Sequence, residues 1–299
     1  MARRGSQRGR FRPSDPMEAR TEARRCAGQL RLGLQRRTWE GRIGSMAGAG
    51  TGSSIDFQDH RPYFPGDDPR HIDWAAYARS GQTIMKLYRE EVSPRLDLVL
   101  DVSRSMVFAS EKRDQVLRLF YFCLESALGA GAALRVWTVS GAGAAVVPPE
   151  TWSGGGWDPS ETPGAAGPPA LDRVPFRSGS LRVLLTDVLY DAPPFDTVTR
   201  LTERNGRGVV LAPWMREEER PDWEGNLELV DCERHTVRRQ RVDRRVLDRY
   251  RRAYARHLDA WRESCRRYGV AFARVPCGVS LARGLEAEAL PTGVVETWG

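Results

Sequence analysis

Residues 96–106 read Leu-Asp-Leu-Val-Leu-Asp-Val-Ser-Arg-Ser-Met, and this stretch decides the fold prediction. The apolar run that begins at Leu96 stops at Asp101, where polar side chains follow. A short aliphatic run that ends in polar groups is typical of a buried parallel strand. Open α/β sheets bind their ligands at the carboxyl edge of such strands. We therefore expect Asp101, Ser103 and Ser105 to project one carboxylate and two hydroxyls at that edge.

Hard oxygen donors of this kind suit Mg²⁺ or another hard divalent cation and are poor ligands for soft metals. A second buried strand, Leu181-Arg-Val-Leu-Leu-Thr-Asp-Val-Leu, becomes polar at Asp187. A carboxylate at the end of an apolar strand needs a partner or a cation. Asp187 is thus either a metal ligand or a cap of the following loop, and Asp191 is a weaker alternative ligand. The metal hypothesis requires that no lysine or arginine head group fills this pocket.

The elements around these two strands alternate between strand and helix. Residues 111–129 have the apolar spacing of an amphipathic helix, and residues 133–139 are predicted to form the next strand. A strand, a helix and a further strand predict a parallel sheet. Other strands are expected at 83–88, 208–213, 227–231 and 269–275, and helices at 195–205 and 244–268. The predicted fold is α/β, doubly wound, with a mainly parallel sheet and helices on both faces.

The Asp-x-Ser-x-Ser pattern after a buried strand resembles the metal-ion-dependent adhesion site of von Willebrand factor A-type domains. A second motif precedes it, Tyr63-Phe64-Pro65-Gly66-Asp67-Asp68-Pro69-Arg70-His71-Ile72-Asp73-Trp74. That motif resembles the signature of a bacterial family, "domain of unknown function 58", whose members carry a von Willebrand A-like module. The similarity runs from about residue 45 to about residue 290.

This resemblance implies a metal site whose ligands are Asp101, Ser103, Ser105 and Asp187, with Asp187 facing the Asp-x-Ser-x-Ser turn. In the resembling fold a threonine completes the site. Four residues remain candidates for that role: Thr151, Thr162, Ser178 and Ser180.

The motif at residues 63–74 is predicted to begin with a turn, because Pro, Gly and Asp each favour one. Asp68 is placed to cap a short helix that starts at Pro69. Two interpretations compete for the segment: a clasp that holds the N-terminal extension against the sheet, or a surface that recognises a partner. The partner-binding candidates are Arg61, Asp67, Asp68, Arg70, Asp73 and Trp74. His71 is expected to be a surface residue, since no nucleophile accompanies it.

The net charge of +7 is unevenly distributed. Residues 1–42 hold twelve arginines against four acidic residues, a local +8, while the remainder has 34 basic and 35 acidic residues. We expect residues 1–15 to be disordered, because they offer little apolar surface to bury. This arm either contacts nucleic acid or anionic membrane by charge, or is a solvated tail. The predicted organisation is a basic arm (1–42), disordered then helical, a signature segment packed on the core domain (43–94), a von Willebrand A-like domain (95–290) and a tail (291–299).

Composition excludes several classes of protein. No apolar run approaches the roughly 18 residues of a membrane-spanning helix, and the basic N-terminus lacks the apolar core of a secretory signal. A cytoplasmic protein is therefore expected. Five scattered cysteines argue against a disulfide framework or zinc site, and Cys123 and Cys265 are expected in the core. The Gly-rich residues 43–54 lack the pattern of a phosphate-binding loop.

No catalytic set emerges, so the first functional hypothesis is a non-enzymatic protein-binding module. Its divalent ion would leave one coordination position for a carboxylate of a partner protein. The resemblance implies an adaptor or chaperone-like role beside a MoxR-type AAA+ ATPase. The alternatives are a metal-dependent hydrolase, in which the ion activates water, and a nucleic-acid binder that uses the basic N-terminal arm. Nucleic acid is the less favoured partner.

Overall fold

The computed structural model describes residues 15–33, 55–65, 67–90, 94–159 and 164–297. The chain divides into a larger unit, residues 1–36 with 94–299, and a smaller unit, residues 37–93. Each unit is described by itself. The expected disorder of residues 1–15 concerns almost entirely residues outside the described ranges, as does the Gly-rich stretch at 43–54.

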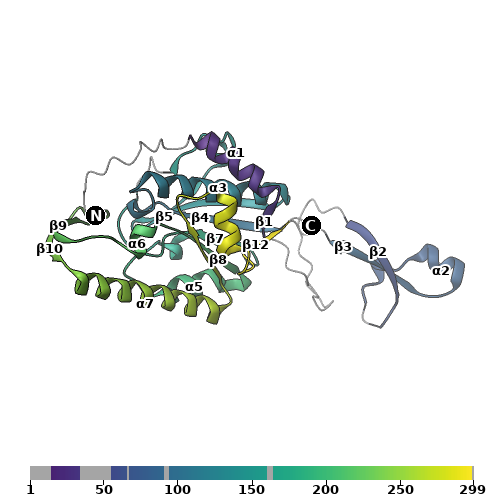
Figure 1. The fold of residues 1–299 in the computed structure, drawn as a ribbon. Coiled ribbons are helices and arrows are strands. Elements are labelled where there is room, and N and C mark those ends of the chain that lie inside the picture. Colours follow the sequence, from purple (N-terminus) through teal and green to yellow (C-terminus); the bar gives the residue numbers. More distant parts are fainter. Residues whose placement is uncertain (1–14, 34–54, 66, 91–93, 160–163, 298–299) are drawn as a thin grey trace. The chain divides into compact units, whose positions relative to one another are not determined.

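A six-stranded sheet forms the centre of the larger unit (Figure 1). Its strands lie in the order β11 (Ala271–Pro276), β8 (Arg207–Trp214), β7 (Leu181–Leu185), β4 (Arg95–Asp101), β5 (Ala133–Ser140) and β6 (Gly143–Val147). Every neighbouring pair is parallel except β5 and β6, which are antiparallel. The prediction of a mainly parallel sheet is confirmed.

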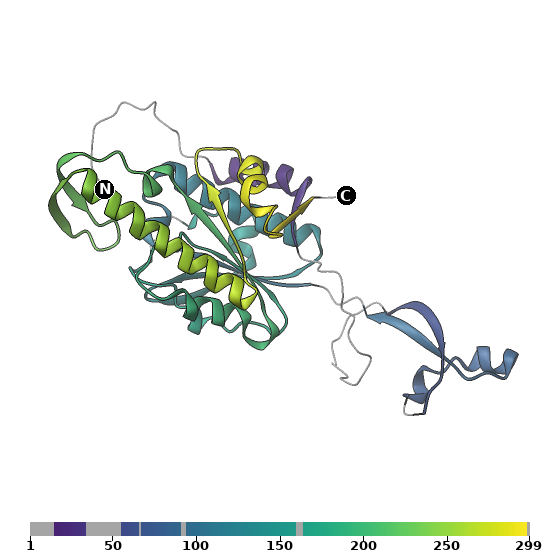
Figure 2. The same cartoon turned by 60° about the horizontal axis from the view of Figure 1, so that its bottom comes forward.

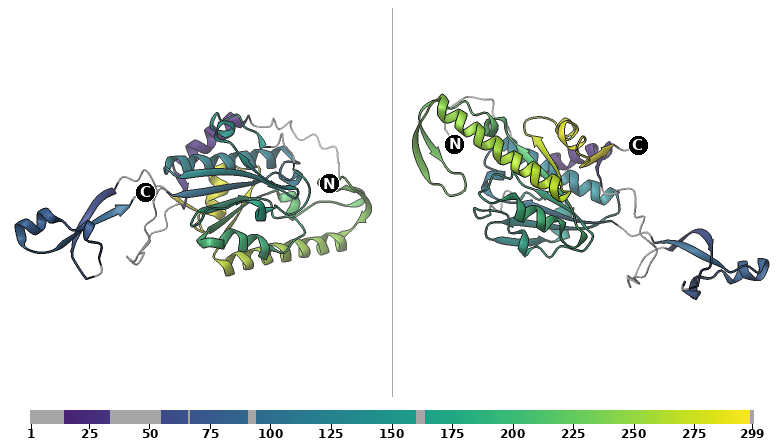
Figure 3. Two further views of the ribbon diagram at one scale, coloured as in Figure 1. Left: turned by 180° about the vertical axis from the view of Figure 1, so that it is seen from behind. Right: turned by 90° about the horizontal axis from the view of Figure 1, so that it is seen from below.

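Helices cover both faces of this sheet (Figures 1 and 3). One face carries α1 (Pro16–Ala27), α3 (Ser110–Gly129), α8 (Leu281–Gly284) and the adjoining π-helix η6 (Leu285–Ala289). The other face carries α5 (Pro194–Thr202) and α7 (Arg244–Tyr268). Two separate apolar clusters result, one on each side of the sheet. This is the doubly wound α/β arrangement that the sequence predicted.

Short elements connect these layers. Single helical turns are η2 (Arg104–Met106), α4 (Pro149–Ser153), η4 (Leu171–Arg173), η5 (Glu203–Asn205) and α6 (Arg216–Glu219). Two antiparallel strand pairs in the described part of the larger unit lie outside the main sheet: β1 (Leu30–Leu32) with β12 (Val295–Thr297), and β9 (Gly225–Val230) with β10 (Val237–Val242). The β9–β10 hairpin directly precedes α7 (Figure 2). None of the helices in the described ranges has the length and apolar character needed to cross a bilayer.

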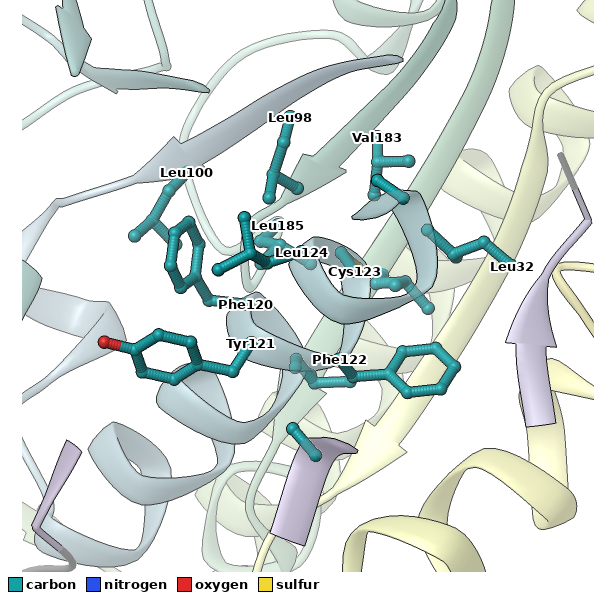
Figure 4. Packing of buried hydrophobic residues seen from close by; sticks show 14 of the residues in the cluster. Leu32, Leu98, Leu100, Phe120, Tyr121, Phe122, Cys123, Leu124, Val183 and Leu185 are labelled. Atoms are coloured by element: carbon teal, nitrogen blue, oxygen red, sulfur yellow. The ribbon is translucent and has the colours of Figure 1, made fainter. Parts of the chain in front are cut away.

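Helix α3 supplies most of the apolar packing on its face of the sheet. Phe120 and Leu124 point from α3 toward Leu98, Leu100 and Leu185 on the central strands (Figure 4). All of these side chains are buried, as the apolar spacing of the helix predicted. Leu128 of the same predicted stripe is 45% exposed, however, and Tyr121 and Phe122 outside it are fully buried. Cys123 and Cys265 are buried as predicted, and all five cysteines are free thiols.

The N-terminal helix α1 packs on α3. Ala19 and Ala23 are fully buried, because small side chains let two helices approach closely. Glu125 of α3 accepts hydrogen bonds from Arg20 Nε at 2.6 Å and Arg24 Nε at 2.9 Å. Strand β1 then pairs with β12, so the two ends of the described chain lie side by side. The helical part of the predicted arm and the predicted tail thus both belong to the larger unit.

Strand β4 carries one charged residue in its apolar run. Asp97 is completely buried and accepts hydrogen bonds from Ser180 Oγ at 2.7 Å and Arg177 Nε at 3.0 Å. Replacing Asp97 by alanine should lower the free energy of unfolding by about 2 kcal/mol, because Arg177 and Ser180 lose their acceptor but Arg177 can still reach water. Urea denaturation measures this loss, and the exposed Asp172→Ala should change stability by less than about 0.5 kcal/mol. If Asp97→Ala left the free energy of unfolding unchanged, the buried contacts of Asp97 with Arg177 and Ser180 would contribute no net stability.

Candidate functional site

The site lies where the order of the strands reverses. The chain leaves β4 for β5 on one side and later returns to form β7 on the other side of β4. Leu100 pairs with Leu185, so the residues that follow these strands emerge next to each other at the carboxyl edge. This is the position at which open α/β sheets bind ligands.

The Asp-x-Ser-x-Ser turn is closed by its own hydrogen bonds. Ser103 N donates to Asp101 Oδ1 at 2.9 Å, and the hydroxyls of Ser103 and Ser105 lie 3.1 Å apart. Asp101 and Ser103 are buried, whereas Ser105 is partly exposed. The turn therefore presents its two hydroxyls together, as the sequence predicted.

Asp187 lies at the end of β7 and is also buried. Its Oδ1 accepts a hydrogen bond from Leu189 N at 3.0 Å, so it caps the following loop. Ser105 and Asp187 both line one pocket at this edge of the sheet. The structure thus brings all four predicted residues together, and Asp187 caps the following loop, as the second interpretation expected.

Lys112, in the first turn of α3, also contacts Asp187. Its Nζ lies 2.8 Å from Asp187 Oδ2 and 2.6 Å from Glu218 Oε1 of α6, and its side chain is fully buried. Burial alone lowers the pKa of Lys112, but the two carboxylates outweigh it and raise the pKa. Burial likewise raises the pKa of Asp187, but the Lys112 charge reverses the effect and the pKa is lowered. Lys112 and Asp187 therefore form a buried, fully ionised pair.

Asp101 is in a different electrostatic state. Burial, and then repulsion by the charge of Asp187, raise the pKa of Asp101 to about 7. Thr186 Oγ1 donates to Asp101 Oδ2 at 2.7 Å, so both carboxyl oxygens of Asp101 are occupied by protein groups. Near neutral pH the carboxyl of Asp101 is only partly ionised.

None of the four candidates for the completing threonine is shown at the site. Ser180 donates to Asp97, which lies at the amino end of the same sheet. Ser178 donates to the carbonyl of Arg204, and Thr151 is an exposed residue of α4. Thr162 lies outside the described residues.

A carboxylate from the β9–β10 hairpin reaches the turn. Glu233 Oε1 accepts a hydrogen bond from Ser105 N at 2.6 Å. Glu233 Oε2 is enclosed from solvent and has no hydrogen-bond partner among the described residues. A second contact joins the same two loops, between Arg104 and His235. The sequence-based hypothesis expected the carboxylate of a partner protein to bind here. In the structure a carboxylate of the same chain, that of Glu233, contacts the turn.

These contacts decide whether the residues fit a divalent ion. Asp187 is neutralised by Lys112, and each oxygen of Asp101 and Asp187 already accepts a hydrogen bond from a protein donor. The described residues contain no group of three or more His, Cys, Asp or Glu side chains arranged to hold a metal. The metal hypothesis required that no lysine or arginine head group occupy this position, but the Lys112 ammonium contacts the predicted ligand Asp187. As arranged, the site does not fit a resident divalent ion.

A pocket of about 880 Å³ opens over this cluster, and we call it the edge pocket. Ser103, Ser105 and Asp187 form part of its lining. The rest comes from the start of α3, from α6, from the β9–β10 hairpin, from Tyr250 of α7 and from loops that include Ala166, Leu189 and Trp223. Its walls carry nine carboxylates and a single arginine, Arg234. Apolar side chains share the lining, chiefly those of Phe108, Leu189, Tyr190, Met215, Trp223 and Tyr250. The pocket is therefore both acidic and apolar.

The predicted partner-binding residues lie in the smaller unit, which consists of β2 (Ile55–Pro62), η1 (Pro69–His71), α2 (Trp74–Ser80) and β3 (Ile84–Glu90). Asp68 caps η1 as predicted, and also pairs with Arg70 at 2.7 Å. Arg61 and Asp67 form a two-fold ion pair at 2.7 and 2.8 Å, and Asp73 caps α2. These contacts are local and structural. Trp74 differs, because it is 62% exposed; its ring lies edge-on to that of Tyr77, with the centroids 6.1 Å apart.

Sequence reasoning missed Lys112, Glu218 and Glu233. One signal for Lys112 was present: the chain has 46 basic residues, of which only Lys86 and Lys112 are lysines. Lys112 also lies in the first turn of a helix, where the helix dipole disfavours a cation. No comparable signal marks Glu218 or Glu233 among the many exposed acidic residues.

One stretch of the chain matches a known protein family. Residues 59–155 match the family described as "Protein of unknown function DUF58", a shorter stretch than the residues 45–290 over which the resemblance was expected. No curated protein matches the chain. Two solved structures from Bacteroides are similar, with TM-scores of 0.34 each. The conserved hypothetical protein BatB from Bacteroides thetaiotaomicron is 12% identical and aligns over 67% of this chain and 98% of its own. An aerotolerance-related membrane protein from Bacteroides fragilis is 13% identical and aligns over 68% of this chain and 98% of its own.

Proposed function

We propose that this chain is a non-enzymatic protein-binding module and that the edge pocket is its binding site. One observation carries the proposal: a large pocket with apolar walls opens at the switch point of the sheet, directly over the Asp-x-Ser-x-Ser turn. Apolar lining with a few fixed polar groups is typical of sites that bind another molecule.

The hydroxyl groups at the site support binding rather than covalent catalysis. Ser103 and Ser105 hydrogen-bond to one another, and neither contacts a histidine in the described chain. His257 contacts the carbonyl of Val188, and His235 contacts Arg104. An activated serine nucleophile needs a base within hydrogen-bond reach.

The family resemblance supplies the finer version of this proposal. The larger unit would be a von Willebrand A-like module, and the partner would be a MoxR-type AAA+ ATPase for which the chain acts as an adaptor or chaperone. Capture of a partner carboxylate through Mg²⁺ is the less favoured mechanism, because Lys112 already neutralises Asp187. If that mechanism operates, millimolar Mg²⁺ must bind the purified chain, and calorimetry measures such binding directly.

Site-specific photo-crosslinking tests the proposal in living cells. A photoreactive amino acid at Leu189, which lines the pocket and is 37% exposed, should form adducts with a defined partner protein. The matched control is Val146 on β6, which is 57% exposed and does not line the pocket. Identical adducts at both positions, or none at Leu189, would refute the edge pocket as the binding site.

A further inference from the structure

We infer that the edge pocket binds a partner segment that carries arginine next to an apolar residue, and not a segment that carries a carboxylate. This inference rests on the proposed function and specifies the chemistry of the partner. It reverses the charge that a divalent ion at this site would select.

The charge of the pocket is the first argument. The charge of Lys112 partly neutralises Asp187 and Glu218, but the Lys112 side chain is fully buried and does not line the pocket. Four other carboxylates of the lining form no ion pair with a described residue: Glu111, Asp191, Asp222 and Glu224. The lining has nine carboxylates and one arginine, Arg234, and a wall of predominantly one sign raises the local concentration of ligands of the opposite sign. An incoming carboxylate would be repelled, whereas a guanidinium would be attracted.

The aromatic side chains of the lining are the second argument. Trp223 and Tyr250 lie with their ring centroids 5.8 Å apart, and Trp223 sits between Asp222 and Glu224 in the sequence. Guanidinium groups stack on aromatic faces and donate in pairs to carboxylates, which a compact ammonium does less well. Aromatic rings flanked by carboxylates therefore favour arginine over lysine.

Glu233 provides the third argument. Its carboxylate lines the pocket and is fixed there by the hydrogen bond that Oε1 accepts from Ser105 N at 2.6 Å. It forms no ion pair with a residue in the described ranges. A bound carboxylate would meet this fixed negative charge, whereas a cationic side chain would be attracted to it.

The test uses the full chain and labelled nonapeptides in which arginine alternates with phenylalanine and glycine. Fluorescence anisotropy should show the arginine peptide binding at least tenfold tighter than a peptide with citrulline, its neutral isostere, and no binding of a glutamate peptide. The variant Asp222→Asn/Glu224→Gln should weaken arginine-peptide binding at least threefold, and Trp223→Ala should weaken it several-fold. The matched control Glu150→Gln/Asp172→Asn removes the same charges from exposed positions outside the pocket and should change affinity less than twofold.

The outcomes separate this inference from the proposed function. Binding of the glutamate peptide instead of the arginine peptide would overturn the inference but leave the edge pocket as a protein-binding site. Equal weakening by the pocket and control variants would show nonspecific attraction and would also overturn it. The chain's own residues 1–14 carry five arginines and could compete. If the peptide binds only after those arginines are changed to serine, the occupant is internal and a partner segment is refuted. Failure of both peptides, together with absent crosslinks at Leu189, would refute both proposals.

Discussion

Replacing Lys112 by methionine should lower the free energy of unfolding by about 3–5 kcal/mol, because removing one partner of a buried ion pair leaves the other charge uncompensated. Methionine keeps the approximate length and volume of the side chain but removes its charge. Asp187 and Glu218 would then lie 2% and 11% exposed with no cation between them. Denaturation in urea at neutral pH measures the loss.

The Lys112–Asp187 ion pair should also affect how stability depends on pH. The pKa of Asp187 is lowered in the folded chain, so its contribution is present above the unfolded pKa of about 3.9 and is lost as the pH falls through the folded value. The pKa of Lys112 is raised, so its contribution is present below about 10.4 and is lost only in stronger base. In Lys112→Met the Asp187 carboxyl has lost the cation that lowers its pKa, so burial raises that pKa and protonation relieves part of the cost. The difference in stability between wild type and Lys112→Met should therefore be largest above neutral pH and shrink as the pH falls through the raised value.

A double variant provides the control for this experiment. Lys112→Met/Asp187→Asn removes both charges of the Lys112–Asp187 pair, so it should be more stable than the sum of the two single changes predicts. Additive losses would show that Lys112 and Asp187 do not interact energetically. A Lys112→Met variant as stable as the wild type would mean that the ammonium is not the cation of this site.

The sequence could predict those parts of the site that depend on local pattern. Leu96–Leu100 and Leu181–Leu185 are apolar runs that end at polar residues, and neighbouring parallel strands bring such ends together at one edge. The local pattern predicted Asp101, Ser103 and Ser105 as one turn at that edge, and the family resemblance implied that Asp187 faces it. The long helix α7 was predicted with its observed bounds, because its apolar stripe repeats over seven turns and Gly269 ends it in the left-handed region.

The charge balance of the site depends on contacts between distant segments. Lys112 and Glu218 are 106 residues apart in the sequence, and Ser105 and Glu233 are 128 apart. No periodicity links such residues, and carboxylates on short turns are normally solvated. The metal hypothesis counted the oxygen donors of two strand ends but could not identify the protein cation that neutralises one of them. The acidic and apolar character of the edge pocket was hidden for the same reason.

Replacing Asp101 by asparagine should stabilise the protein above pH 7, by about 2–4 kcal/mol, although it removes a residue at the centre of the site. The pKa of Asp101 is raised to about 7 by burial and by the charge of Asp187. A raised carboxyl pKa means that the folded state binds its proton more tightly than the unfolded state. The contribution is therefore fully present below about pH 3.9 and is lost as the pH rises to about 7.

Asparagine has the same shape, carries no charge and can still accept the hydrogen bond from Ser103 N that Asp101 Oδ1 accepts. The variant should match the wild type near pH 4 and exceed it increasingly up to pH 8, as measured by thermal or urea unfolding across that range. Asp187→Asn is the matched control, since it also turns a buried aspartate of this site into its amide. Its effect should have the opposite sign, because the pKa of Asp187 is lowered and its charge is balanced by Lys112. If instead Asp101→Asn destabilises at pH 8 and abolishes a stabilisation by Mg²⁺, then Asp101 is an ionised metal ligand and the divalent-ion mechanism is correct.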